Sequence, residues 1–151
     1  MEEFLKIKKK LYEACLLFAE EKHNTVISII ESNKKALFSE TKSSAGDKHE
    51  TGRAMLQLEM EKASQQLAVI NQMKAILEKI SIENKSEISC LGSVITTNKA
   101  TYYLAISAGK ITIENTDFYA VSTNSPIGKQ LLGKRVGAII SFNNAKILEV
   151  Y

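Results

Sequence analysis

The chain has 151 residues, of which 44% are hydrophobic and 25% are charged, and its formal net charge is +3. This composition is typical of a globular protein and excludes wholesale disorder. The net charge is too small to predict that bulk charge alone binds the chain to nucleic acid or to a membrane surface.

Residues 1–80 have the pattern of two long helices. They contain no proline, and their only glycines are Gly46 and Gly52. Apolar residues recur at strides of three and four, which makes the narrow stripe of a coiled coil. Two such stripes can cover each other only if the chain folds back. We therefore predict an antiparallel α-helical coiled-coil hairpin over residues 1–80, with its tip near residues 43–52. The stripe residues are Phe4, Ile7, Leu11, Ala14, Phe18, Val26, Ile29, Ile30 and Leu37 before the tip, and Leu56, Met60, Ala63, Leu67, Ile70, Met73, Leu77 and Ile80 after it.

Residues 82–151 have a different composition, with most of the glycines, the single proline and many β-branched and aromatic residues. They predict a small antiparallel sheet, with the segment 111–115 pairing back on 101–107 as a hairpin. Ser125 and Pro126 are a helix cap and a first helical residue, and Gly133 is placed to end that short helix. The predicted strands are 90–98, 101–107, 111–115, 117–122 and two within 138–151 around an Asn143–Asn144 turn. The fold class is therefore α+β.

The lysine run and the two cysteines predict which side chains are exposed to solvent and in which cellular compartment the protein lies. The run Lys8–Lys10 predicts a solvated helix face. Cys15 and Cys90 each lie among apolar neighbours, so we predict two buried thiols in a reducing compartment. Neither a signal-peptide core nor a membrane-length apolar stretch is visible, and we expect a cytoplasmic protein without membrane contact.

Two segments carry a resemblance to a known family. At the tip, the stretch Ala45–Glu50 reads AGDKHE, in which Gly46, Asp47 and Glu50 match a Gly-Asp-x-x-Glu motif. The stretch Asn124–Phe142 has Ser-Pro-Ile, an apolar pair, Gly-Lys and Val-Gly in the matching order. The chain thus resembles the bacterial Gre transcript-cleavage factors, which join a coiled-coil hairpin to an FKBP-like domain. It departs from them after the tip glutamate, where Thr51-Gly52-Arg53-Ala54 replaces the usual Asn-Ala-Glu-Tyr.

The resemblance implies an accessory factor of RNA polymerase that is not an enzyme alone. Asp47 would be the direct ligand of a Mg²⁺ ion shared with the polymerase, and Glu50 would position the attacking water. The factor would promote cleavage of backtracked nascent RNA, which it contacts only indirectly. It would bind no cofactor alone and act as a monomer. In the second domain we expect the partner-binding residues Ser125, Pro126, Ile127 and Gly128.

Other interpretations of the same residues remain open. Asp47 and Glu50 also fit a capping box at the start of a helix, where acids suit the positive end of the helix dipole. A protein of the same architecture could occupy the polymerase channel as a regulator without promoting cleavage. The hairpin could also be an oligomerisation arm of a protein unrelated to polymerase.

Overall fold

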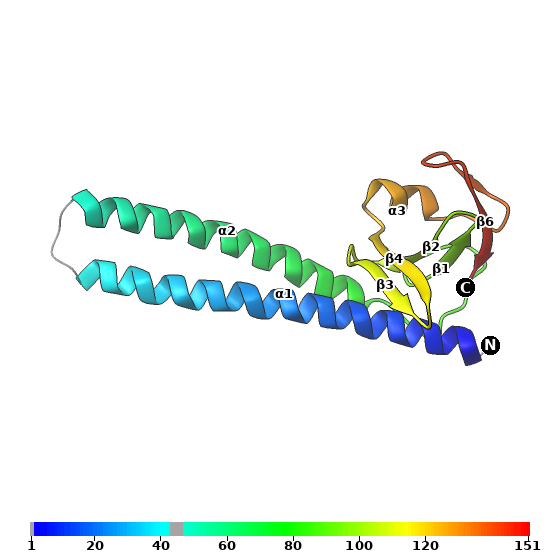
Figure 1. Cartoon of the computed structure of the whole chain (residues 1–151), viewed down its shortest axis with the longest axis horizontal. Helices are drawn as coiled ribbons and strands as arrows, with labels where there is room; N and C mark the ends of the chain where they lie inside the picture. The colour runs from blue at the N-terminus through cyan, green and yellow to red at the C-terminus, as the bar shows by residue number, and fades with distance from the viewer. Residues whose placement is uncertain (1, 43–46) are drawn as a thin grey trace. The chain divides into compact units, whose positions relative to one another are not determined.

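The computed structural model describes residues 2–42 and 47–151, with side chains described for 2–39 and 51–151. The fold is α+β: two long helices precede a six-stranded mixed sheet that carries one short helix (Figure 1). The elements in chain order are α1 (Glu2–Lys42), α2 (Asp47–Glu78), β1 (Val94–Thr97), β2 (Thr101–Ala105), β3 (Gly109–Ile113), β4 (Thr116–Ser122), α3 (Pro126–Leu131), β5 (Ile139–Ile140) and β6 (Ala145–Val150).

Contacts divide the chain into two units, and both long helices take part in each. Unit 1 comprises Met1–Phe18 and Lys74–Tyr151, and unit 2 comprises Ala19–Met73. The boundary between the two units therefore falls within α1 and within α2. The domain boundary predicted from composition instead falls near residue 81, after the end of α2. The predicted tip, 43–52, includes the first six residues of α2.

Unit 2 is a pair of helical segments that run in opposite directions (Figure 1). Val26 from α1 and Ala63 and Ile70 from α2 form its buried cluster, with Ile30 and Leu67 packed against it. These residues all belong to the predicted stripe. One position departs from it, because the side chain facing inward between Ile30 and Leu37 is the polar Asn33, only 7% exposed.

In the first turns of α1 the stripe prediction is confirmed at Leu11, but each of the other buried residues lies one position after a predicted one, which is Ile7, Ala14 or Phe18. The buried residues there are Lys8, Leu11, Cys15 and Ala19, while Phe4 remains partly exposed. The prediction that Lys8 lies on a solvated face is therefore wrong. Its ammonium group donates a hydrogen bond of 2.9 Å to the carbonyl of Asn84. Which side of α1 is buried here is therefore decided by a segment that is distant in sequence.

The sheet of unit 1 has the strand order β3-β4-β2-β1-β6-β5. Its β2 and β4 strands are parallel and the other neighbours are antiparallel, so the prediction of an antiparallel sheet is wrong at this pair. The reason is that β3 does not pair back on β2 as expected. It pairs with β4, which lies between them, and the chain skips one strand position after β2.

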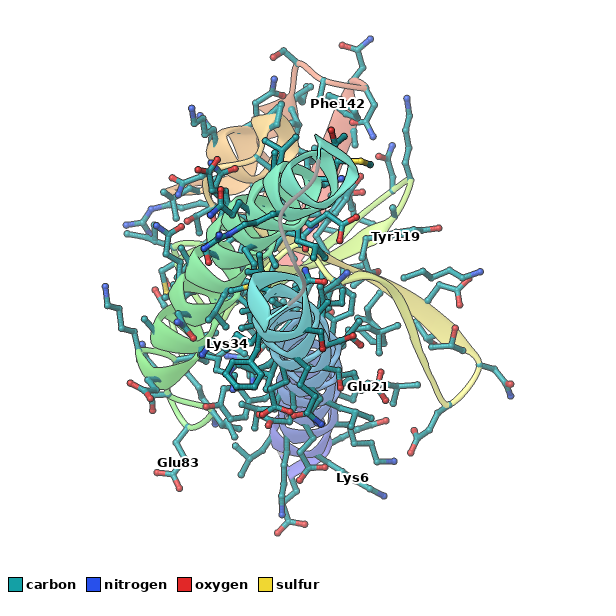
Figure 2. The ribbon with its side chains drawn as sticks, turned by 90° about the vertical axis from the view of Figure 1, so that its left-hand side faces the viewer. Lys6, Glu21, Lys34, Glu83, Tyr119 and Phe142 are labelled. Atoms are coloured by element: carbon teal, nitrogen blue, oxygen red, sulfur yellow. The ribbon has the colours of Figure 1, made fainter. Side chains whose placement is uncertain are left out.

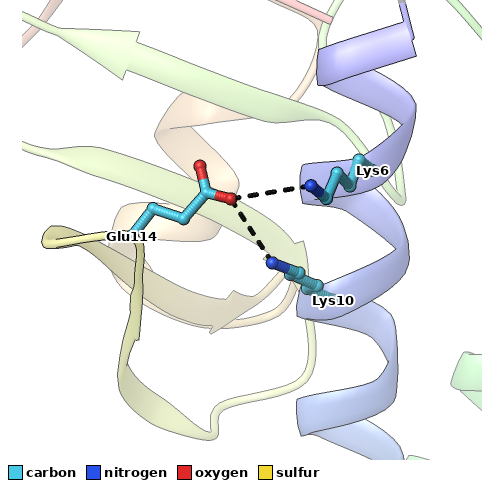
Figure 3. A network of polar contacts seen from close by, with 3 residues as sticks. All are labelled: Lys6, Lys10 and Glu114. Carbon is cyan, nitrogen blue, oxygen red and sulfur yellow. Dashed lines mark hydrogen bonds and ion pairs between the residues drawn. The ribbon is translucent and has the colours of Figure 1, made fainter.

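The turn between β3 and β4 explains why that hairpin was missed. Glu114 and Asn115 both have positive φ, at 50° and 67°, which is the conformation that two-residue hairpins require. The sequence carries no Gly there to signal it. The turn is also tied to α1, because the carboxylate of Glu114 lies 3.4 Å from Lys10 and 3.9 Å from Lys6 (Figure 3). These side chains are largely exposed, so the ion pairs add little stability.

One face of the sheet is covered by α3. Ile95, Leu104 and Ile147 from the sheet form a buried cluster with Leu131 of α3, and Ile127 packs against it. The helix begins as predicted: Ser125 is its N-cap and Pro126 its first residue. It ends at Leu131, and Gly133 follows with a φ of 77°.

The opposite face of the sheet carries Val94, Tyr103, Phe118 and Ala120, all of them buried. The first turns of α1 lie here: burial raises the pKa of Tyr103 above its ordinary value, and the neighbouring Cys15 and Tyr12 of α1 raise it further. Tyr12 donates a hydrogen bond of 3.0 Å to the carbonyl of Leu77, which joins α1 to the end of α2 within unit 1. Neither of these helices, over its described residues, is apolar enough along its length to cross a membrane.

Candidate functional site

The two tip acids lie at the beginning of α2. Asp47 is the first residue of this helix and Glu50 lies in its first turn. Their side chains fall outside the described residues, as do Gly46 and the rest of the segment 43–46. Their roles in metal binding, in water positioning and in helix capping therefore stay predictions.

The predicted partner-binding residues Ser125 to Gly128 form the start of α3. The hydroxyl of Ser125 accepts a hydrogen bond of 3.0 Å from the amide of Gly128 and donates one of 2.6 Å to the carbonyl of Ser122. Gly128 is buried, and a Cβ added there would lie 1.8 Å from the same carbonyl. Ser125 and Gly128 thus have a structural role in this turn. Pro126 is exposed and Ile127 is half-buried, so these two keep some surface for a partner.

Next to this turn, unit 1 exposes an apolar and basic surface that the sequence analysis did not single out. On the β5–β6 ribbon the outward side chains are Ile139, its pairing partner Lys146, and Leu148. Ile139 is 67% exposed, and Val136 and Phe142 in the flanking loops are each 60% exposed. The only sign of this surface in the sequence is the pair Ile139–Ile140. Successive side chains of a strand point to opposite faces, so one of the two must be exposed when the other is buried.

The two cysteines differ in their surroundings. Cys15 is fully buried against the backbone of Ile106, and burial raises the pKa of its thiol to about 12. Cys90 is only half-buried, with its sulfur 3.5 Å from the hydroxyl of Ser93, so the prediction of a buried thiol is confirmed for Cys15 and wrong for Cys90. In the part of the chain that the structure describes, no three His, Cys, Asp or Glu side chains come together in a way that could hold a metal ion.

Comparisons with known proteins found neither a family model that matches the chain nor a curated protein with significant similarity.

Proposed function

We propose that this protein is an accessory factor of RNA polymerase that promotes cleavage of backtracked nascent RNA. In this proposal α1 and α2 form a coiled-coil hairpin, and its tip brings Asp47 and Glu50 to the polymerase active site. There the two carboxylates complete the coordination of a second Mg²⁺ ion. The C-terminal part is an FKBP-like domain that docks on the polymerase.

The observation that carries the proposal is the position of the two acids relative to the helices. Asp47 begins α2 directly after the connection from α1, and Glu50 follows in the same turn. The α2 segment within unit 2, residues 47–73, is about 40 Å long at ~1.5 Å per residue. In this proposal the two helices enter the channel side by side, and their length lets the acids, at the far end of the pair, reach the active site.

The chemistry fits carboxylates that act in a complex. Mg²⁺ keeps several waters and takes one or two protein carboxylates, so two acids alone in water bind it weakly. In an active site that already holds one metal ion, the same two acids would stabilise the attacking and leaving oxygens through the second ion. The polymerase would supply the remaining ligands and the RNA.

The order of elements supports the proposed docking domain. After the long helices come a six-stranded mixed sheet and α3, and the Ser-Pro-Ile residues of one of the two segments that carry the resemblance form the cap and first turn of α3. The exposed side chains Ile139, Val136 and Phe142, with nearby basic residues, offer apolar and charged contacts for a partner surface.

The test is RNA cleavage in stalled elongation complexes at limiting Mg²⁺. We expect the wild-type protein to accelerate cleavage, and Asp47→Ala to lose at least about 100-fold of that acceleration, while its binding to core polymerase is unchanged. Glu50→Ala should lose less. Glu59→Ala is the matched control, because Glu59 is an exposed acid further along the same helix, and it should behave like wild type.

Two results would contradict the proposal. If the wild-type protein binds polymerase and competes with a known cleavage factor without stimulating cleavage, the protein is a channel regulator. If it does not bind polymerase and forms a stable dimer at all concentrations, the helices are an oligomerisation arm.

A further inference from the structure

Unit 1 contains a groove between the start of α1, the segment that follows α2, and the end of β6. Its volume is about 410 Å³, which lies within the range of small-molecule sites. The lining residues are Phe4, Leu5, Lys8, Ile82, Lys85, Ser86, Glu87, Val150 and Tyr151. Neither the tip acids Asp47 and Glu50 nor the residues Ser125 to Gly128 line it.

Most of the groove wall is apolar. The rings of Phe4 and Tyr151 stack with their centroids 4.1 Å apart and an interplanar angle of 21°. Leu5, Ile82 and Val150 continue this wall. Tyr151 is held in place by two backbone hydrogen bonds with Val94, of 2.7 and 3.0 Å, so the wall is anchored to the sheet. A flat or extended hydrocarbon body would be well covered here.

The polar part of the groove is positively charged. Lys8 is only 5% exposed, and among the described residues the carbonyl of Asn84 is the acceptor that its ammonium group finds. An ammonium has three N–H donors, so this group can accept a further partner. Burial lowers the pKa of Lys8 from its ordinary value, whereas Cys90 raises it and Lys85 lowers it. A buried cation beside a second lysine is a place where an anion would be stabilised.

Two acids of the segment that follows α2 have exposed side chains. The side chain of Glu87 is 95% exposed, and its carboxylate lies 3.9 Å from Arg135. Glu83 extends away from the protein into solvent (Figure 2). The lining therefore combines two lysines with one acid that faces outward, against an apolar wall.

We propose that this groove binds a small amphipathic anion, with its carboxylate at Lys8 and its hydrocarbon or aromatic body along Phe4, Leu5 and Val150. A carboxylate would form a charge-assisted hydrogen bond with the buried ammonium, which is stronger than the bond to a neutral carbonyl. A cationic ligand would be repelled by the ammonium group of Lys8, and a neutral alcohol would offer it only an uncharged acceptor, which makes a weaker hydrogen bond. The proposal is independent of any role at the polymerase.

The test is methyl NMR on the full chain with three probes of equal chain length: octanoate, octan-1-ol and octylammonium. We expect saturable shifts with octanoate in the methyl signals of Leu5, Ile82 and Val150. Octan-1-ol should bind about tenfold more weakly, in line with the loss of a charge-assisted bond. Octylammonium should give no saturable shift, and the methyl groups of Leu67 and Ile70 in unit 2 should not respond.

Two variants separate the polar and apolar contributions. Lys8→Met keeps a long side chain in the buried position, and it should remove the preference for octanoate over octan-1-ol. Lys110→Met is the matched control, because Lys110 is an exposed lysine of the same unit, and it should keep the preference. Leu5→Gln changes a partly exposed wall residue with little risk to folding, and it should weaken both probes alike.

Three outcomes would overturn the proposal. One is the absence of saturable shifts with octanoate into the millimolar range. Another is equal binding of all three probes, which would make the groove a plain apolar surface. The third is an unchanged preference in a folded Lys8→Met variant. Should Lys8→Met fail to fold, the probe series on the wild-type protein still decides the first two outcomes, and Leu5→Gln, which must weaken octanoate and octan-1-ol alike, tests the apolar wall.

Discussion

The two units are held together by different kinds of contact. In unit 1 the enclosed side chains come from distant parts of the chain, such as Leu11 of α1, Tyr103 of β2 and Leu131 of α3. In unit 2 those that the structure describes form one narrow row around Val26 and Ile70. Unit 2 therefore depends on helical hydrogen bonds and a single apolar seam. We expect it to open locally at a lower free energy than unit 1 unfolds.

This difference has a consequence for the proposed function. The acids Asp47 and Glu50 belong to the unit with the thinner core, whereas the proposed docking surface belongs to the unit with the thicker one. In the proposed function, the unit with the thicker core would bind the polymerase. The pair of helices, which deforms more easily, would insert into its channel. Experiments that perturb one unit and observe both can test this difference.

The largest effect is expected at Gly128 in unit 1. In Gly128→Ala the new Cβ would meet the carbonyl oxygen of Ser122 at 1.8 Å, so the backbone of the turn before α3 must move. We expect a loss of about 4 kcal/mol or more in the free energy of unfolding, at the upper end for single substitutions. Urea unfolding followed by the tyrosine signals of the sheet would measure it.

Gly133→Ala is the matched control for that substitution. Gly133 has a φ of 77°, but the space that a methyl group would occupy there is open, so only backbone strain opposes an alanine. We expect a cost of about 1 kcal/mol. Equal costs at the two glycines would show that the close approach at Gly128 is not what holds this turn.

The second effect compares one core residue from each unit. Leu104→Ala in β2 should cost about 3 kcal/mol, because Leu104 is fully enclosed and the sheet cannot collapse into the cavity. Ile70→Ala in α2 should cost about 2 kcal/mol, and hydrogen exchange should show that the loss is confined to the amides of unit 2. If Ile70→Ala also accelerates exchange throughout the sheet, the two units unfold together and the comparison fails.

Sequence patterns predicted the features that depend on neighbouring residues. The two long helices follow from the stride of their apolar residues, and the cap at Ser125 follows from the Ser-Pro pair. The turn at Asn143–Asn144 was also predicted, and Asn144 indeed has a positive φ of 57°. The tip acids were predicted to lie at the bend between the helices, whereas the structure has Asp47 and Glu50 in the first turn of α2. Their side chains lie outside the described residues.

The features that were missed depend on contacts across the chain. The parallel pairing of β2 with β4 follows from the pairing of β3 with β4 instead of with β2. No local sequence pattern predicts which strand β3 pairs with. The burial of Lys8 depends on Asn84, which is 76 positions away in sequence. The groove at Lys8 could not be found from sequence for the same reason, since three separate segments form its wall.

The third effect is a gain in stability within unit 2. The amide nitrogen of Asn33 is buried in the seam and has no acceptor among the side chains and backbone that the structure describes. Asn33→Leu should therefore raise the free energy of unfolding of unit 2 by about 1–2 kcal/mol, because the desolvation cost of the amide disappears. Slower hydrogen exchange in α1 and α2 would measure it. A lower stability would mean that Asn33 instead selects the register of the two helices.

The smallest effect tests whether the first turns of α1 belong to unit 1. Burial raises the pKa of Cys15 to about 12, above the ordinary value of about 9. A raised pKa favours the protonated thiol in the folded state. Its contribution to stability is therefore complete below pH ~9 and is lost as the pH rises from there toward ~12. We expect this thiol to account for a loss of about 1 kcal/mol between pH ~9 and ~10.

Cys15→Ala should remove this part of the alkaline loss, whereas Cys90→Ala, at a half-buried position, should leave it in place. The measurement is the free energy of unfolding of unit 1 as a function of pH in the three proteins. Because Cys15 ionises only when α1 leaves the sheet, the slope reports on that contact and not on unit 2. An identical slope in wild type and Cys15→Ala would mean that α1 detaches before unit 1 unfolds, and its first turns would then share the low stability of unit 2.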